Sequence, residues 1–402
     1  MATGASQLTT LHAVAGVRLG SAMAGIKKAS HRDTLLIEIA DQSSVAAVFT
    51  RNAFCAAPVQ VAKAHLAAGQ PRYLLVNTGN ANAGTGELGL QAALQSCNAI
   101  AQLCSVAAEQ VLPFSTGVIG EHLCVEKLVA ALPDACASLS EEGWELAATT
   151  ILTTDTRPKG TSRQFQLDGK TVTITGICKG SGMIKPNMAT MLGYVATDAA
   201  IEPALLDTLL REAVESSFNR ITVDSDTSTN DAVVLIASGR AEIAVGGDNI
   251  GIFSAQLNAL FLELAQSIIR DGEGASKFVA VTVSSAATQA EALAAAYAVA
   301  ESPLVKTALA ASDPNWGRIL AAVGRAGIER LEVDKIAVAL NGVSIVQRGG
   351  RAASYTEEAG QAAMASEEIT IAIDLARGSI AETVWTCDLT YEYVRINAEY
   401  RT

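Results

Sequence analysis

The chain has 402 residues, 50% of them hydrophobic and 4% aromatic, with a net charge of −12. This length allows two or three core-forming units, and the acidic balance without runs of Lys or Arg argues against a nucleic-acid partner. The N-terminal residues lack the basic and apolar regions of a signal peptide, and no apolar run approaches the ~18 residues of a membrane span, so we expect a cytoplasmic protein with no membrane partner.

The predicted elements mix strands and helices along the chain. A buried strand is expected at 72–76, an apolar-periodic helix at 88–104, and a helix to about 152 that opens on a capping box of Ser138 and Glu141. Asp168-Gly169 is a hairpin turn between two alternating runs. The later elements are helices at 203–216, 251–269 and 289–301, strands at 232–237 and 278–283, a hairpin turn at Asn341-Gly342, and strand-like alternation at 369–376 and 380–394. Antiparallel sheets covered by helices fit this order better than a parallel barrel.

Cysteines and histidines offer no metal site. The seven cysteines are scattered without CxxC spacing, as in a protein with reduced thiols, and no two of the four histidines stand three or four residues apart. We therefore expect neither disulfides nor a bound metal, and no cofactor.

Three patterns suggest other chemistry but have plainer explanations. Gly84–Gly89 fits G-x-G-x-x-G, yet it begins too far from the preceding strand for a dinucleotide site. Asp224, Asp226 and Asp231 lack the glycine and terminal glutamate of a calcium loop, so capping and Asx turns are favoured. Cys178 has no histidine near it in sequence and is expected to be a buried core residue.

The segment 178–192, CKGSGMIKPNMATML, breaks the pattern as a strained connection between two strands. Within it, Thr190 could attack the carbonyl of Ala189, and cleavage of that bond would free an α-amine beside the hydroxyl. An α-amine with a pKa of about 7.7 to 8.0 suits a general base near neutral pH. Spacing alone, however, favours a simple buried strand.

Nine motifs in order resemble the ornithine acetyltransferase family, the glutamate N-acetyltransferases of the cyclic arginine pathway. They are VFTRN (48–52), NTGNANAGTG (77–86), FSTGVIGE (114–121), TTDTRPK (153–159), KGSGMIKPNMATML (179–192), DSDTSTND (224–231), DGEGASK (271–277), SDPNWGR (312–318) and YVRINAEYRT (393–402). The resemblance implies a layered α/β (α+β) sandwich of mixed or antiparallel sheets covered by helices, similar to the N-terminal-nucleophile hydrolases but differently connected. It also implies self-cleavage between Ala189 and Thr190 into chains 1–189 and 190–402, which assemble as a tetramer of two copies each.

The resemblance also implies the roles of single residues. Thr190 becomes the acetylated nucleophile with its own α-amine as base, and Thr116 and Gly117 form the oxyanion hole. The substrate-binding residues are Thr153, Lys179, Thr190, Glu273, Asn397 and Thr402. We expect Lys179 to suit the substrate α-carboxylate and Glu273 its free amine. Thr154 is an alternative to Thr153.

The reaction implied is acetyl transfer from N2-acetyl-L-ornithine to L-glutamate with ping-pong kinetics. The sequence leaves open whether acetyl-CoA is a second acetyl donor. Two alternatives to this function are a self-cleaving aminopeptidase or amidohydrolase of related fold, which would hydrolyse the acyl-enzyme, and a non-catalytic binding protein.

Overall fold

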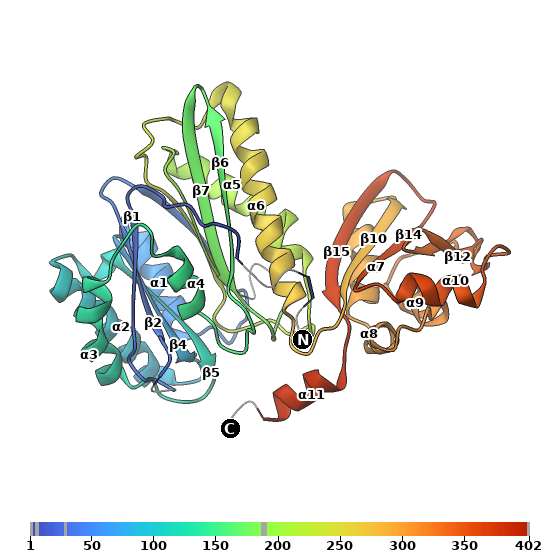
Figure 1. The fold of residues 1–402 in the computed structure, drawn as a ribbon, viewed down its shortest axis with the longest axis horizontal. Helices are drawn as coiled ribbons and strands as arrows, with labels where there is room; N and C mark the ends of the chain where they lie inside the picture. Colours follow the sequence, from blue (N-terminus) through green and yellow to red (C-terminus); the bar gives the residue numbers. More distant parts are fainter. Residues whose placement is uncertain (1–2, 5–7, 28–29, 186–190, 400–402) are drawn as a thin grey trace. The chain divides into compact units, whose positions relative to one another are not determined.

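The computed structural model describes residues 3–4, 8–27, 30–185 and 191–399. The chain forms two compact units, each visible as a ribbon in Figure 1. Unit 1 comprises Met1–Ser6, Arg220–Asp226 and Ile269–Thr402, and unit 2 comprises Gln7–Asn219 and Thr227–Ile268. The expected boundary between residues 189 and 190 lies inside unit 2, so the expected chains and the compact units are different divisions.

Unit 2 contains two sheets. The first sheet has four strands in the order β1 (Val17–Ala22), β2 (Thr34–Ile39), β4 (Tyr73–Asn80), β5 (Val111–Val118). The second sheet has five in the order β3 (Ser44–Phe49), β9 (Ala232–Ala237), β8 (Leu192–Thr197), β7 (Lys170–Lys179), β6 (Lys159–Leu167). Only β4–β5 and β8–β9 pair in parallel among these described strands.

The two sheets of unit 2 bury their facing sides against each other. One apolar cluster takes residues from both sheets, including Leu74 and Leu112 from the first and Ile177 and Val234 from the second. Phe114 and Tyr194 meet across this layer edge to face, with ring centroids 5.5 Å apart. The result is a sandwich whose core lies between the sheets.

Helices cover the outer faces of this sandwich. α2 (Gly86–Cys104) and α3 (Val125–Ala137) pack on the first sheet, and α1 (Ala57–Ala68) packs on β5. α5 (Pro203–Ser216) packs on β3 and β9 of the second sheet. α4 (Trp144–Thr150) contributes Trp144 and Ala148 to the core between the sheets. Layers of helix, sheet, sheet and helix confirm the predicted α/β sandwich of mixed sheets.

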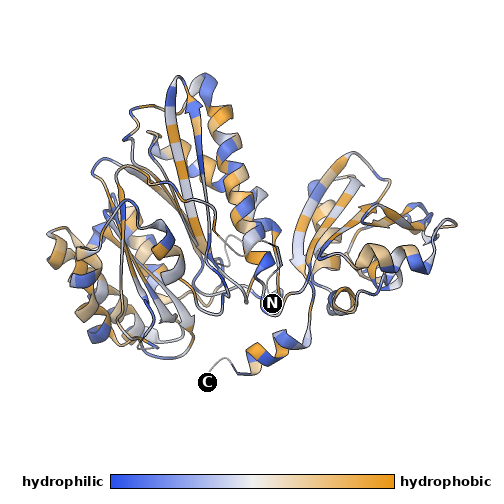
Figure 2. Ribbon diagram, viewed as in Figure 1, coloured by the Kyte–Doolittle hydropathy of each residue, from blue (hydrophilic) through white to orange (hydrophobic). Residues whose placement is uncertain are grey.

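α6 (Ile250–Arg270) is the longest helix described, and the span Gly247–Arg270 is long and apolar enough to cross a membrane by composition alone. Its apolar residues are instead used inside the protein, since Leu257 and Leu260 are fully buried. Gly176 of β7 lies directly beneath it, where a Cβ would be 2.9 Å from Leu264. Hydrophilic residues interrupt the hydrophobic ones along α6 in Figure 2. These observations identify α6 as a core helix.

Unit 1 is built on one six-stranded sheet. Its order is β13 (Gly350–Arg351), β12 (Val343–Gln347), β11 (Ala337–Leu340), β14 (Glu368–Asp374), β10 (Phe278–Ala286), β15 (Ile380–Cys387), with only β10–β14 parallel among these described strands. An apolar cluster joins this sheet to helices on one face, α7 (Gln289–Ala300), α8 (Pro303–Ala310), α9 (Trp316–Gly324) and α10 (Glu357–Met364). α11 (Tyr391–Ala398) follows β15 and contains no buried residue. Short 3-10 turns lie at Ala108–Gln110, Phe218–Arg220, Gly247–Asn249 and Val333–Lys335.

Both predicted hairpins are confirmed. Asp168 and Gly169 have φ of +47° and +81° between β6 and β7, and Asn341 and Gly342 have +44° and +82° between β11 and β12. Positive φ at both central residues is what a type I′ turn requires, and these residue types tolerate it.

Two predicted elements are present but have wrong bounds. Ser138 and Glu141 do not open a helix, because α3 ends at Ala137 and α4 begins only at Trp144. The Ser138 hydroxyl accepts from Ser21 N, and the Glu141 carboxylate accepts from Gly16 N.

The alternation at 380–394 also does not continue as a strand. β15 ends at Cys387, and Thr390 caps α11 by accepting from Glu392 N at 3.2 Å.

Candidate active site

The end of β5 carries Thr116 and Gly117 at an irregularity of the first sheet. The register shifts at Asn80, which is paired with both Thr116 and Val118. Gly117 has φ of +136°, and a Cβ on it would lie 2.3 Å from the carbonyl carbon of Gly79. Only glycine fits this approach, and such a bulge changes the direction of the strand at the two predicted oxyanion donors.

Lys179, the last residue of β7, contacts two other predicted site residues. Its Nζ donates to Thr153 Oγ1 at 2.8 Å and to Thr116 Oγ1 at 3.3 Å. Its side chain is 11% exposed, so it is largely desolvated. Three predicted residues from separate parts of the sequence therefore converge. Of Thr153 and Thr154, it is Thr153 whose hydroxyl contacts Lys179.

Asp155 holds this group together, and the sequence analysis did not identify it. Its fully buried carboxylate accepts from Lys159 Nζ at 2.6 Å, from Gly180 N at 2.7 Å and from Thr153 N at 3.1 Å, and it lies 3.8 Å from Lys179 Nζ. Burial alone would raise the pKa of Asp155. The charges of Lys159 and Lys179 and the hydrogen bonds outweigh burial and hold that pKa well below its usual range.

Lys179 is the more accessible of the two lysines in this cluster. Lys159 and Lys179 both lie within 4 Å of the carboxylate of Asp155, and their side chains are 1% and 11% exposed. A carboxylate ligand would pair with the partly accessible ammonium of Lys179. The cluster therefore fits an acidic substrate group.

The second sheet places the beginning of β8 beside Lys179. Leu192 is the register partner of Lys179 on one side and of Ala232 on the other, and Met191 O accepts from Ala232 N at 3.0 Å. The predicted cleavage pair Ala189 and Thr190 lies outside the described residues, as does Thr402.

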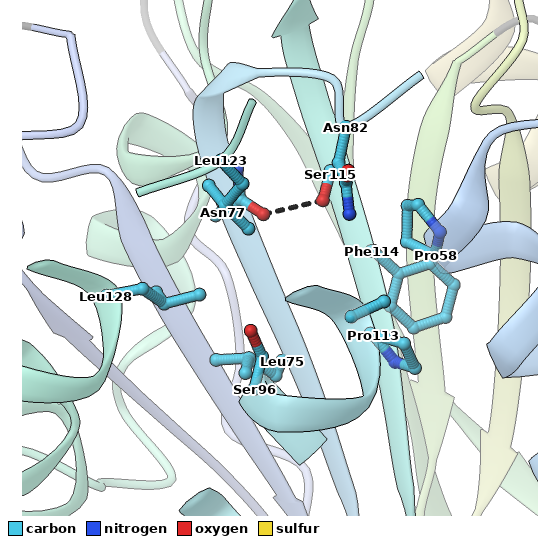
Figure 3. Close-up of a pocket in the computed structure, with 11 residues that line it drawn as sticks. Pro58, Leu75, Asn77, Asn82, Ser96, Pro113, Phe114, Ser115, Leu123 and Leu128 are labelled. Atoms are coloured by element: carbon cyan, nitrogen blue, oxygen red, sulfur yellow. Dashed lines mark hydrogen bonds between the residues drawn. The ribbon is translucent and has the colours of Figure 1, made fainter. Parts of the chain in front are cut away.

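A small pocket lies between the first sheet and its helices, on the β4 and β5 side chains drawn in Figure 3. Its volume is about 10 Å³, room for no more than a single water molecule, so it is not a substrate site. Ser115 Oγ donates to Asn77 Oδ1 at 2.6 Å along its wall, the dashed line in Figure 3. Because Ser115 lines the pocket and directly precedes Thr116, the pocket belongs to the polar network next to Thr116.

Asn230 and Asp231 were also missed as site residues. Asn230 is buried and donates to the carbonyl of Ser115 at 2.9 Å. Asp231 is buried, and among the described residues its Oδ2 has no hydrogen-bond partner. Burial raises the pKa of Asp231 well above its usual value, against the opposing effects of Ser228 and Lys179. The available signal was the DSDTSTND motif, whose aspartates we expected in caps and Asx turns.

Unit 1 contains a second set of predicted residues. Asn397 on α11 donates from Nδ2 to Glu273 Oε2 at 2.8 Å. The loop that carries Glu273 is tied to the start of α11, since Thr390 Oγ1 donates to Gly274 O at 2.7 Å. A Cβ on Gly274 would lie 2.5 Å from Tyr393 N, so this contact also requires glycine. The structure thus brings Glu273 and Asn397 together.

Several acidic groups lie near Tyr393, whose carbonyl oxygen accepts from Asn397 Nδ2 at 3.0 Å. Tyr393 donates to Asp224 Oδ2 at 3.2 Å, and burial followed by the charge of Asp224 raises the pKa of Tyr393. Glu273 and Asp226 act on Tyr393 in the same direction. Negative charge from several carboxylates suits a cationic ligand group such as an amine.

Of the three other patterns, Cys178 is the buried core residue that we expected, whereas Asp231, which we expected in a cap or turn, is buried directly before β9. Cys178 is fully buried beneath α6, and burial raises the pKa of its thiol to about 12. Gly89 packs against Thr85 inside α2. Asp226 N donates to Asp224 Oδ1 at 3.5 Å in a local turn. No group of three metal-ligating side chains occurs among the residues that the structure describes.

Comparison with known proteins gives consistent matches. The ArgJ family model matches residues 18–402. The arginine biosynthesis bifunctional protein ArgJ of Pseudomonas syringae pv. tomato is 58% identical over 406 residues, and that of Pseudomonas fluorescens is 57% identical, each covering 100% of both chains. The crystal structure of arginine biosynthesis bifunctional protein argJ from Bacillus halodurans is 40% identical with a TM-score of 0.50, covering 52% of this chain and 99% of that one.

Proposed function

Because the chain belongs to the ArgJ family, we propose that it transfers the acetyl group of N2-acetyl-L-ornithine to L-glutamate in arginine biosynthesis. The acetyl group is carried as an ester on Thr190. The observation that carries the proposal is the meeting of Thr116, Thr153 and Lys179 beside the first residues of β8, which begins at Leu192, two residues after the predicted nucleophile.

The first step is self-cleavage. The Thr190 hydroxyl adds to the carbonyl carbon of Ala189, the C–N bond breaks, and the acyl group moves to oxygen while nitrogen takes up the hydroxyl proton. Water then hydrolyses this ester, which leaves a carboxylate on Ala189 and a free α-amine on Thr190. The Bacillus halodurans chain is matched over 99% of its length by 52% of this chain, so it is about half as long, which supports a two-chain protein.

The transfer follows in two halves. The Thr190 hydroxyl attacks the acetyl carbonyl of the donor while the α-amine accepts its proton and passes it to the leaving ornithine nitrogen. The tetrahedral oxygen is stabilised by the Thr116 hydroxyl and the Gly117 N–H, and one such donor is typically worth about 2.7 to 4 kcal/mol of barrier. The glutamate amine then attacks the acetyl ester and the ester C–O bond breaks, while the α-amine passes a proton from the attacking nitrogen to the Thr190 oxygen. Ornithine therefore leaves before glutamate reacts.

Charge at the two groups of residues supports this substrate choice. The partly exposed ammonium of Lys179 fits the α-carboxylate that both substrates share. Glu273 and Asn397, with further carboxylates near the neighbouring Tyr393, fit the side-chain amine of ornithine. Thr402 is proposed to contribute to substrate binding.

Intact mass spectrometry tests the central claim. The wild type should give two chains and Thr190→Ala a single chain of 41.5 kDa. The wild type should also gain one acetyl group on the chain that begins at Thr190 when the donor is added without glutamate. Two chains from Thr190→Ala, or an active wild type that stays intact, would overturn the mechanism.

Glutamate dependence separates transfer from hydrolysis. Release of ornithine should require glutamate in the steady state, whereas an aminopeptidase would release it steadily with water alone. We further propose that acetyl-CoA is a second donor, in keeping with the relatives' name, bifunctional protein. Acetylation of Thr190 by acetyl-CoA alone is the measurement that decides this. The assembly is proposed to be a cytoplasmic tetramer of two copies of each chain, which native mass spectrometry measures.

A further inference from the structure

Asn230 connects the strand that carries Thr116 to the second sheet. It immediately precedes Asp231 and β9, and its side chain is buried. Its Nδ2 donates to the carbonyl oxygen of Ser115 at 2.9 Å and to that of Ala81 at 2.5 Å. These carbonyls belong to the β5 strand and to the residue after β4, so one amide joins three parts of unit 2.

The amide has no spare donor. A primary amide has two N–H groups, and both are used on main-chain carbonyls, while its oxygen accepts from Thr229 Oγ1 at 2.6 Å. An aspartate at this position would set carboxylate oxygens against two carbonyl oxygens. A hydrophobic residue would remove the side-chain donor from both carbonyls. The position therefore needs an amide.

The contact with Ser115 fixes the peptide group that leads into Thr116. The oxygen of Ser115 and the N–H of Thr116 belong to one planar unit, so holding the oxygen sets the orientation of that unit. On the far side of Gly117, Ala81 N donates to Val118 O at 2.9 Å. Thr116 and Gly117 thus lie between two anchored peptides, and both anchors involve Ala81.

The other end of Asn230 is fixed on β9. Asp231 O accepts from Thr50 N at 2.9 Å, and Ala232 N donates to Met191 O at 3.0 Å. The main chain at Asn230 is therefore tied to the strand that begins after the predicted nucleophile.

We propose that Asn230 is a positioning residue that sets the Thr116 and Gly117 donors relative to β8. This inference rests on the proposed function, since the donors matter only if an oxyanion forms there. A displacement of about 1 Å at a reacting centre can cost about 100-fold in rate. Loss of this amide should consequently lower kcat more than it changes substrate affinity.

The test compares Asn230→Ala and Asn230→Asp with wild type, using N2-acetyl-L-ornithine and L-glutamate. We expect kcat per cleaved chain to fall about 10- to 100-fold, with both KM values within about threefold, and Asn230→Asp to be at least as slow as Asn230→Ala. The matched control is Asn249→Ala, which removes another buried amide with two acceptors, Asp168 Oδ2 and Ala244 O, at the turn end of the β6–β7 hairpin. It should keep wild-type kcat.

A double-mutant cycle distinguishes positioning from a general loss of structure. In a Thr116→Ala background the hydroxyl donor is already absent, so adding Asn230→Ala should cost clearly less than it does alone. If the variants fail to cleave, hydrogen exchange of the β5 amides in Thr190→Ala chains replaces kcat as the readout. Exchange should then speed up at least about tenfold in β5 and not in β10.

Wild-type kcat in Asn230→Ala, an additive cycle, or unchanged β5 exchange would overturn the inference while leaving the proposed function intact. A wild type that transfers no acetyl group would instead refute the proposed function, whatever the variants do.

Discussion

Replacing Asp155 by Asn tests the buried ion cluster directly. The side chains of Asp155 and Lys159 are 0% and 1% exposed, so neither charge can turn to water. The variant removes the carboxylate that both lysines contact, and it turns amide hydrogens toward N–H donors that bond to a carboxylate in the wild type. Breaking such a buried pair costs about 3 to 5 kcal/mol.

The matched control is Asp207→Asn. Asp207 and Arg211 also stand four residues apart, but their side chains are 44% and 53% exposed. An exposed pair of this kind contributes about 0.3 to 0.5 kcal/mol. Both variants are made in the Thr190→Ala background, so that chain cleavage does not differ between them, and hydrogen exchange of β7 amides gives the free energy of opening unit 2.

The pH dependence has a definite sign. The pKa of Asp155 is lowered on folding, so its stabilising contribution is complete above the usual aspartate pKa of about 3.9 and is lost as the pH falls below it. The stability lost in Asp155→Asn is therefore largest near pH 7 and shrinks in acid, where a protonated carboxyl resembles the amide. A cost below about 1 kcal/mol at pH 7, or one that grows towards pH 3, would refute this account.

Three further outcomes are expected. Gly117→Ala should lower kcat by more than about 100-fold, because the added Cβ would collide with the main chain of Gly79. The control Gly69→Ala, where a Cβ would have nothing within 4 Å, should keep the wild-type kcat. Equal kcat values for the two variants would contradict the bulge geometry at Gly117. Cys178→Ala should keep acetyl transfer within about twofold, and the wild-type thiol, whose pKa burial raises to about 12, should resist iodoacetamide at about pH 8. Glu273→Gln should raise the KM for N2-acetyl-L-ornithine about tenfold or more, and an unchanged KM would remove Glu273 from the amine site.

Local chemistry explains which elements could be predicted. The Asp168-Gly169 and Asn341-Gly342 turns depend on φ preferences of two adjacent residues, and the structure confirms both. Ser138 and Glu141 have the spacing of a cap, but their partners, Ser21 and Gly16, lie more than a hundred residues away. A pattern read from neighbouring residues cannot reveal such partners.

The site residues also divide into those that the sequence predicted and those that it did not. The motif resemblance named Thr116, Thr153 and Lys179, and the structure places them in mutual contact through Lys179. Asp155 and Asn230 lie within the TTDTRPK and DSDTSTND motifs, but the motifs do not reveal their roles, because Gly180 and Ser115, which they contact, are brought near only by the fold. These polar residues organise their surroundings because they are buried, and whether a single position is buried depends on the whole fold.

The strand order of the second sheet has a consequence for a cut before residue 190. β8 and β9 would then belong to one fragment but stand between β3 and β7 of the other, with six residue pairs along each seam. Cleavage of the backbone would not separate the two fragments, because the β3–β9 and β7–β8 pairings would both have to break at once. The nicked molecule would behave mechanically as one body, and its fragments, expressed apart, would each lack the neighbours that complete their strands.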